Sequence, residues 1–435
     1  MIDLRAPAIR LSSALAFAHA IGGRWHKRIA HSGTLSQIVA RSSSTVTLTR
    51  PPTMTRPSTF GTGLLLSAVL SCGGDTTAPP TTGTLEISIV TTGTDIDADG
   101  FVLGIDNDFP RGIGANATLT FSLPPGTHTL ALSGLAFNCD VTTASSSANV
   151  SLGLTTRVDV RAACTPYLSN AIIFTSGQFG LPEVMAMRPD GSRRERLTTD
   201  QAAYSAPVVS PDGQSIAVAS YAEGYWNGIY LLDRFGKART KIVSNSNGVG
   251  SPAWSPDGTK LAFVGILHGP YGDYGRIFIA NRDGTGLRQV SPEVAATDYQ
   301  FDSSPSWAPD GTRLAFERSA VLYLINADGS GLISTGVIGE NPAWSPDGTQ
   351  IAYATIGGGA DGLFVMDGTF TSRRLTTPVQ ADRMAQWSPN GTQLVFERVE
   401  SNVSHIYKVG LDGSGVTKLS TVSQYDASPS WTRTF

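Results

Sequence analysis

Apolar and polar residues alternate along most of the chain beyond residue 83, in short runs separated by glycine, proline, asparagine and aspartate. Runs such as TLEISIV, ATLTFSL and HTLALSG place an apolar side chain at every second position, which is the period of a half-buried β-strand. Turn-forming residues end each run after a few positions. The pattern therefore predicts an all-β protein made of short antiparallel strands.

From residue 167 to residue 435 the alternation is organised into a repeat. Five segments resemble one another: APVVSPDGQSIAVAS, PAWSPDGTKLAFVG, PSWAPDGTRLAFER, PAWSPDGTQIAYAT and AQWSPNGTQLVFER. Their aromatic or equivalent positions, together with a last partial copy, recur every 37 to 53 residues and are Val209, Trp254, Trp307, Trp344, Trp387 and Trp431. This spacing is typical of propeller blades, and each unit has the pattern of four strands.

Two incomplete copies lie at the ends of the repeat. Residues 171–198 supply the last three strands of a blade, and residues 427–431 supply a first strand. Together they predict six blades, closed by pairing of both ends in one sheet. The Ser-Pro-Asp-Gly segments have the residues of tight turns, so we expect structural rather than catalytic roles for Asp212, Asp257, Asp310 and Asp347.

The set of SPDGT, LAF and IY segments with DGSG turns resembles the TolB-type propeller repeat over residues 167–435. The resemblance implies a six-bladed β-propeller. It also implies a periplasmic family of the Tol-Pal system whose propeller channel receives partner peptides. That family carries an α/β domain before the propeller, whereas this sequence predicts strands there, which puts a direct Tol-Pal role in doubt.

Residues 83–165 have the strand pattern of a small β-sandwich, and LPPGTHTLALSGLAFNC resembles immunoglobulin-like or carboxypeptidase-regulatory-like modules. Within this segment Asp95, Asp97, Asp99 and Asp106 have the spacing of an EF-hand calcium loop. The flanking segments have strand patterns instead of helical ones. A hairpin tip rich in turn-forming aspartate is therefore expected, with a calcium site as the alternative.

The amino-terminal segment has the features of export. Residues 1–53 contain seven Lys or Arg and one acidic residue, which is typical of a non-structural extension, and residues 54–71 have the pattern of a signal peptide. Residues 69–72, VLSC, resemble the lipobox of bacterial lipoproteins. This resemblance implies lipidation of Cys72, a tether over residues 72–82, and a place in the bacterial cell envelope, periplasmic or on the outer-membrane surface. A plain secretory peptide is the alternative.

Two cysteines remain after Cys72. In an oxidising compartment we expect Cys139 and Cys164 to form one disulfide, with two free buried thiols as the alternative.

The charge balance narrows the possible partners. A net charge of -3 with 15% charged residues gives no overall attraction to nucleic acid.

A ligand site is instead expected where loops enter the first strand of each blade. The residues five before each aromatic position, with their neighbours, give the predicted channel mouth: Tyr204, Asp302, Glu340, Asp382, Arg383 and Asp426. The alternative is that these aspartates cap loops or bond neighbouring blades. The hairpin with His268, Tyr271 and Tyr274 is a second place for a sugar or peptide.

Catalytic motifs are few. The sequence has no G-x-S-x-G elbow, and its three histidines beyond the signal peptide, His128, His268 and His405, are far apart. We therefore predict a binding or scaffold protein without cofactor or metal, which engages a protein, peptide or glycan through the channel mouth and touches the membrane only through its lipid. The alternative is a carbohydrate-active hydrolase that uses Asp302 with Glu340.

Overall fold

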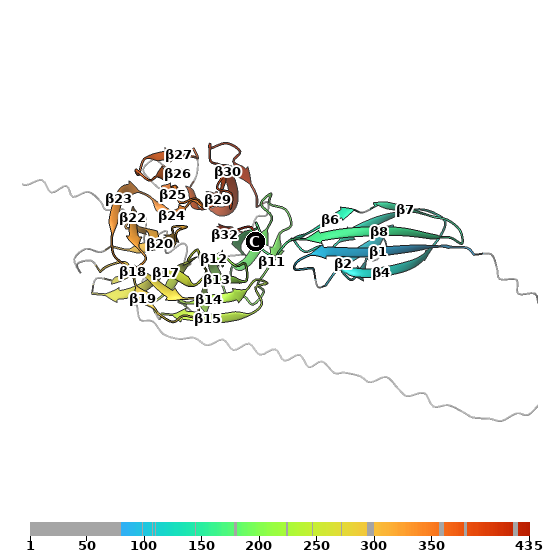
Figure 1. The fold of residues 1–435 in the computed structure, drawn as a ribbon, viewed down its shortest axis with the longest axis horizontal. Coiled ribbons are helices and arrows are strands. Elements are labelled where there is room, and N and C mark those ends of the chain that lie inside the picture. The colour runs from blue at the N-terminus through green and yellow to red at the C-terminus, as the bar shows by residue number, and fades with distance from the viewer. Residues whose placement is uncertain are drawn as a thin grey trace, which may run out of the picture.

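The computed structural model describes residues 80–435 apart from short segments at 98, 107, 109, 144, 178–180, 223–224, 246, 271, 294–299, 356–360, 378–380 and 421–424. Within these residues every regular element is a β-strand, so the predicted all-β class is confirmed. The strands form two bodies, which we call the module (residues 83–164) and the propeller (residues 172–431); they lie end to end (Figure 1). The predicted extension, signal peptide and Cys72 lie outside the described residues.

The module contains two four-stranded sheets that share one core. Leu85, Ile87 and Ile89 alternate along one strand and are buried against Phe101 and Leu103 of the other sheet. One sheet has the order β4 (Asn116–Leu123), β1 (Gly83–Gly93), β8 (Thr155–Cys164), β6 (Cys139–Thr143); the other has β3 (Arg111–Ile113), β2 (Phe101–Ile105), β5 (Gly126–Ser133), β7 (Ser147–Val150). Strands β1 and β8 run parallel, contrary to the expectation of antiparallel strands only, because the chain crosses between the sheets before it returns beside β1.

The propeller contains six four-stranded sheets, and the first strand of each contacts the first strand of the next in a closed ring. Figure 1 shows β12, β20, β24 and β32 near the centre and β15, β19, β23 and β27 at the rim. From the centre outward the sheets are β12 (Tyr204–Val209), β13 (Ser215–Ala222), β14 (Tyr225–Asp233), β15 (Arg239–Ser244); β16 (Val249–Trp254), β17 (Lys260–Gly269), β18 (Gly272–Asn281), β19 (Arg288–Gln289); β20 (Asp302–Trp307), β21 (Arg313–Arg318), β22 (Val321–Asn326), β23 (Ile333–Ile338); β24 (Glu340–Trp344), β25 (Gln350–Thr355), β26 (Gly362–Asp367), β27 (Ser372–Arg374); β28 (Ala381–Trp387), β29 (Gln393–Glu400), β30 (Val403–Gly410), β31 (Thr417–Lys418); and β32 (Tyr425–Trp431), β9 (Ile172–Gly177), β10 (Glu183–Met187), β11 (Glu195–Arg196).

The last of these sheets joins the two ends of the repeat. Strand β32 pairs antiparallel with β9, so that Trp431 lies opposite Ile172 and Ala427 opposite Thr175. The carboxy-terminal strand thus becomes the innermost strand of the sheet that residues 172–196 begin, and β9 is not left as an exposed edge.

The Ser-Pro-Asp-Gly segments form the turns between the first and second strands. Asp257 accepts hydrogen bonds from Ser255 Oγ at 2.6 Å and from the Thr259 amide at 3.1 Å, and Gly258 has a φ of 70°, which suits glycine. The equivalent aspartates, Asp212, Asp310 and Asp347, also accept from the amide two residues later. These residues have the turn-forming contacts that the repeat predicts.

Candidate functional site

A cavity of 810 Å³ lies on the axis of the propeller and is lined by the second halves of all six first strands and the turns that follow them. Its walls consist mainly of proline, serine and tryptophan. Among the described lining residues the single charged side chain is Arg433. The cavity therefore offers aromatic and pyrrolidine faces for apolar contacts, and hydroxyl and carbonyl groups for hydrogen bonds.

A repeated backbone feature shapes the cavity wall. In each first strand the pairing with the second strand shifts register, for example between Ser303 and Ser306. At each shift one non-glycine residue has a φ between 47° and 53°, and all six line the cavity: Ala206, Ser251, Ser304, Asn341, Met384 and Ser428. Such bulges re-aim side chains, and here they form a ring in which Asn341 Nδ2 donates to Ser304 Oγ at 2.9 Å.

Three tryptophans of the repeat join neighbouring sheets beside this ring. The indole N–H of Trp307 donates to the Ala253 carbonyl at 3.2 Å, that of Trp387 to the Ala343 carbonyl at 2.9 Å, and that of Trp254 to the Val208 carbonyl at 3.2 Å. The Trp431 indole donates to Asn170 instead, and the buried indole nitrogen of Trp344 has no hydrogen-bond partner among the described residues. All five residues line the cavity, so the aromatic position shapes the site in each of these sheets and joins neighbouring sheets in three of them.

None of the six residues predicted at the channel mouth lines this cavity, because they lie toward the opposite ends of the first strands. The three aspartates among them, Asp302, Asp382 and Asp426, are fully buried. Each binds a guanidinium through two bonds: Arg318 to Asp302 at 2.5 and 2.7 Å, Arg398 to Asp382 at 2.6 and 2.8 Å, and Arg194 to Asp426 at 2.7 and 2.8 Å. Each of these ion pairs lies within a single blade, so the aspartates are held inside the fold, but the pairs do not bond neighbouring blades as the alternative expected.

The other three predicted residues are also engaged within the protein. Tyr204 is buried and donates through its hydroxyl to Asp200 at 2.7 Å, and burial raises the pKa of its phenol. Arg383 donates from Nε and Nη2 to Glu397 Oε1 at 2.9 and 2.6 Å. Glu340 is buried, which raises the pKa of its carboxyl, while the charge of Arg383 acts in the opposite direction.

A residue that the sequence reasoning missed lies next to Glu340. Burial raises the pKa of Glu317 to about 8, and the negative charge of Glu340 adds to the effect. Ser303 Oγ donates to the Glu317 carboxylate at 3.0 Å. Because burial raises the pKa of both carboxyls, the pair carries less negative charge near neutral pH than two ordinary glutamates would. The sequence signal that could have pointed to Glu317 is the Glu-Arg pair after LAF in this copy of the repeat, because most other copies have no glutamate at that position.

The four aspartates with calcium-loop spacing do not converge. Asp97 accepts from the Ala136 amide at 2.9 Å, whereas Asp106 binds the His128 ring and the Thr129 amide. Within the described residues no group of three or more His, Cys, Asp or Glu side chains is arranged to hold a metal ion. In the outer hairpin, His268 binds Asp273 at 2.7 Å and the Arg276 guanidinium lies over the Tyr274 ring. Tyr271 lies outside the described residues.

The remaining aspartate, Asp95, belongs to the junction between the module and the propeller. It accepts from the Tyr167 amide at 2.8 Å and binds Arg234 of the propeller at 2.5 Å. From the propeller side Arg188 donates to the Phe137 carbonyl at 2.7 Å and to Asp140 at 2.7 Å.

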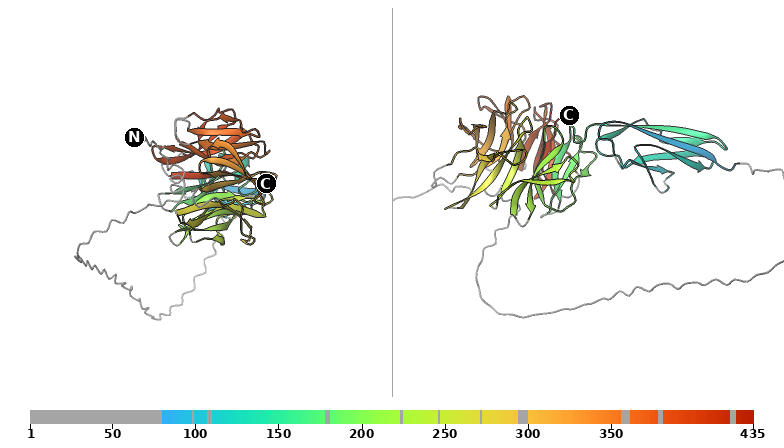
Figure 2. Two further views of the ribbon diagram at one scale, coloured as in Figure 1. Left: turned by 90° about the vertical axis from the view of Figure 1, so that its left-hand side faces the viewer. Right: turned by 60° about the horizontal axis from the view of Figure 1, so that its bottom comes forward.

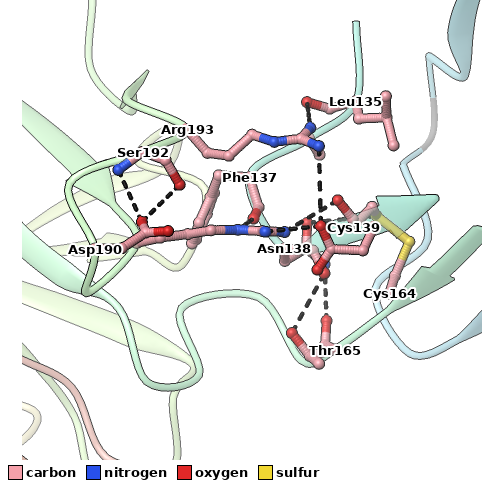
Figure 3. Close-up of polar contacts among 12 residues, drawn as sticks. Leu135, Phe137, Asn138, Cys139, Cys164, Thr165, Asp190, Ser192 and Arg193 are labelled. Atoms are coloured by element: carbon pink, nitrogen blue, oxygen red, sulfur yellow. Dashed lines mark hydrogen bonds and ion pairs between the residues drawn. A yellow bond between two sulfur atoms is a disulfide. The ribbon is translucent and has the colours of Figure 1, made fainter. Parts of the chain in front are cut away.

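Figure 3 shows the centre of this junction. Asn138 donates to the Thr165 carbonyl at 2.7 Å, and the disulfide between Cys139 and Cys164 stands beside these contacts, as the cysteine count predicts. Arg193 of the propeller reaches the Leu135 carbonyl of the module at 3.5 Å. The junction therefore combines charged and backbone contacts with aromatic contacts, in which Tyr167 lies 4.8 Å from both Phe137 and Phe235 between ring centroids.

Comparison with known proteins supports the fold. Residues 330–434 match the family model described as the TolB beta propeller domain. A Protein TolB homolog from Chlorobium luteolum is 30% identical over 148 residues, which is 33% of this chain and 30% of the relative. A Tol-Pal system protein TolB from Anaeromyxobacter dehalogenans is 28% identical over 131 residues, 29% of this chain and 27% of the relative.

A solved structure agrees with these matches. TolB from Acinetobacter baumannii superposes with a TM-score of 0.53 at 20% identity, over 61% of this chain and 67% of that chain. The carboxy-terminal domain is therefore a TolB-type β-propeller, as the repeat predicts. The chain spans less than a third of the length of the curated relatives it matches.

Proposed function

We propose that the chain is a lipid-anchored binding protein of the bacterial cell envelope and that its propeller channel engages an envelope protein or peptide. The observation that carries the proposal is the axial cavity of 810 Å³, to which all six sheets contribute. Packed side chains in the centre would stabilise the ring more than an open cavity does. A cavity lined by every blade therefore favours a binding role over a purely architectural one.

The lining suggests the chemistry of the partner. Trp344 and Trp387 offer aromatic surface. Ser304 and Asn341, which belong to the ring of six residues with positive φ, offer hydroxyl and amide groups. An extended peptide segment matches this mixture, because its backbone hydrogen-bonds to such groups and its side chains pack on the rings. Arg433 favours a segment with a carboxylate near the rim.

Three further observations support a place in the envelope. The VLSC segment resembles a lipobox, with Cys72 as the proposed lipidation site. A disulfide joins Cys139 and Cys164, which suits an oxidising compartment. The relative from Anaeromyxobacter dehalogenans is a Tol-Pal system protein TolB, and we extend an envelope partner from it to this chain as part of the proposal. No helix in the described part of the chain has the length and apolar character to cross a bilayer.

Binding fits the site better than catalysis does. The described lining of the cavity contains no carboxylate, imidazole or thiol, so no acid–base pair faces it. The pair proposed for a hydrolase, Asp302 with Glu340, lies outside the cavity, and Asp302 is held by Arg318. The alternative proposal is a glycan ligand at the opposite mouth, with Tyr204, Glu340 and Arg383 as the predicted contacts.

The test is capture of partners from envelope extract by the chain that begins at residue 73. We expect a partner to be retained by the parent chain and lost when Gln386→Trp fills the cavity, because Gln386 lies on its wall. The matched control is Ser244→Trp, at an exposed position on the outer strand β15. Equal capture by all three chains would exclude the channel as the binding site.

The anchor is tested separately. The full chain is expected in the membrane fraction, and Cys72→Ala should release it to the soluble fraction. A mass spectrum of the membrane-fraction chain that shows no lipid on Cys72 would contradict lipidation at this residue without affecting the channel proposal.

A further inference from the structure

The end of the module that faces away from the propeller presents two leucines to solvent. Leu152 is 51% exposed and Leu154 is 63% exposed, and both belong to the turn between β7 and β8. Gly153 between them has a φ of 67°, so the turn is tight and holds the two side chains out together. Nothing in the core of the module requires leucine at either position.

The neighbouring segments at this end are also uncharged. Gly83 lies opposite Leu123 and Gly126 lies opposite Val150, which brings three segments into one surface, residues 80–85, 121–127 and 149–156. We call this surface the distal tip. Its described segments contain no charged residue, and Pro124 and Pro125 are exposed beside the leucines. The opposite end of the module, at the junction, is rich in Asp and Arg contacts.

The chain enters the module at the distal tip. The Gly153 amide donates to the Thr82 carbonyl at 3.1 Å, and the Thr84 amide donates to the Leu154 carbonyl at 2.8 Å. Eight peptide steps separate Cys72 from Pro80, the first described residue, so an extended tether reaches at most about 28 Å. A lipid on Cys72 would therefore hold this end of the module close to the bilayer surface. Figure 2 shows the module projecting from the propeller, with the tip at its far end.

We infer that the distal tip rests on the membrane surface and buries Leu152 and Leu154 in the headgroup region. The inference deepens the proposed function and rests on the lipid anchor proposed above. Exposed leucines gain from transfer out of water, and an uncharged surround avoids the cost of dehydrating ions. The charges that border the tip are paired with each other, Arg157 with Glu86 at 3.1 Å and Asp106 with the His128 ring, so the partner that fits best is a zwitterionic lipid surface rather than an anionic one.

The experiment places a fluorescent reporter at the tip. Leu154→Trp is made in the full chain, which is then mixed with zwitterionic phosphatidylcholine vesicles whose acyl chains carry bromine. We expect quenching of the added emission. The matched control is Leu287→Trp, at a propeller position that is 54% exposed, and it should not be quenched. The chain without either change supplies the background from the native tryptophans, which downstream of Cys72 all lie in the propeller.

Vesicle flotation of the same samples separates the anchor from the tip. The Leu154→Trp and Leu287→Trp chains are also made with Cys72→Ala, and vesicles are added to them up to a high lipid concentration. Quenching can then be measured in chains that have no lipid anchor. Loss of flotation in Cys72→Ala reports on the anchor alone. Adding Leu152→Asp should weaken quenching at position 154 roughly tenfold, because it places a charge in the buried surface. A far-ultraviolet circular dichroism spectrum and a thermal unfolding midpoint close to those of the parent chain verify that this variant folds.

Two results would overturn the inference. One is equal quenching, or none, at positions 154 and 287 in the lipid-bound chain. The other is a molecular mass that rises with protein concentration and falls to the monomer with Leu152→Asp, because it would assign the tip to contact between two copies.

Discussion

Replacement of Asp302 by alanine should strongly destabilise the propeller. The Asp302 carboxylate is 0% exposed, and its partner Arg318 has a side chain that is 4% exposed. The guanidinium lies over the rings of Phe316 and Tyr323, with the Pro292 carbonyl as its other acceptor. Asp302→Ala leaves this cation buried without its counter-charge. Breaking a buried pair in this way costs about 3–5 kcal/mol. For a domain of this size that lowers the melting temperature by about 10 °C.

The assay is thermal unfolding followed by circular dichroism, with two controls. Asp310→Ala removes a turn aspartate whose side chain is 50% exposed, and should cost about 1 kcal/mol or less. Asp302→Ala combined with Arg318→Met removes both charges, and should recover most of the loss. If Asp302→Ala melts within about 2 °C of the parent chain, the reasoning is refuted, and a carboxylate reserved for a ligand becomes the better interpretation.

Three further predictions concern stability. Replacing Cys139 and Cys164 with alanine should lower the free energy of unfolding of the module by about 3 kcal/mol in urea titrations, given their separation of 25 residues; an unchanged midpoint would contradict this. The folded state holds the Glu317 proton more tightly than the unfolded state, so the parent chain should lose stability as pH rises from 4.5, the ordinary pKa of a glutamate, to about 8. Glu317→Gln should remove this pH dependence. A parent chain whose stability does not change over this pH range would count against the prediction. The Pro124 carbonyl and then Asp106 raise the pKa of His128, so its stabilisation is complete below pH 6.5 and is lost as pH rises through the folded value. The difference between the unfolding midpoints of the parent and His128→Gln should therefore be larger at about pH 5.5 than at a pH above the folded pKa of His128, and a constant difference would exclude protonation as the cause.

The fold of the propeller could be predicted from the sequence because its information is local. Each Ser-Pro-Asp-Gly turn is specified by adjacent residues, and Asp257 with Gly258 shows the expected contacts and backbone angle. Repetition then supplies the long-range arrangement, since every unit needs the same neighbour. The incomplete copies at the two ends predict the pairing that the structure has between β32 and β9.

The orientation of the candidate site residues could not be predicted in this way. Side chains alternate along a strand, but the register shift inside each first strand inserts an extra residue and changes which face the following side chains take. The partner of Asp302 is Arg318 on the next strand, and the same separation recurs between Asp382 and Arg398. The recurring separation could have predicted both ion pairs from the sequence. It does not predict the partner of Asp426, because ring closure brings Arg194 from the other end of the propeller.

The junction determines how the tip and the channel act together. Asp95 binds Arg234, and Arg188 binds the Phe137 carbonyl and Asp140, so charged contacts from both bodies oppose bending at residues 165–171. The module then acts as a spacer whose longest strand, β1, has 11 residues and spans about 36 Å. With the distal tip on the bilayer and the module along the membrane normal, the channel would stand about that far above the lipid. In that orientation we expect a partner that reaches the channel to be a soluble protein or an extended segment held away from the membrane surface.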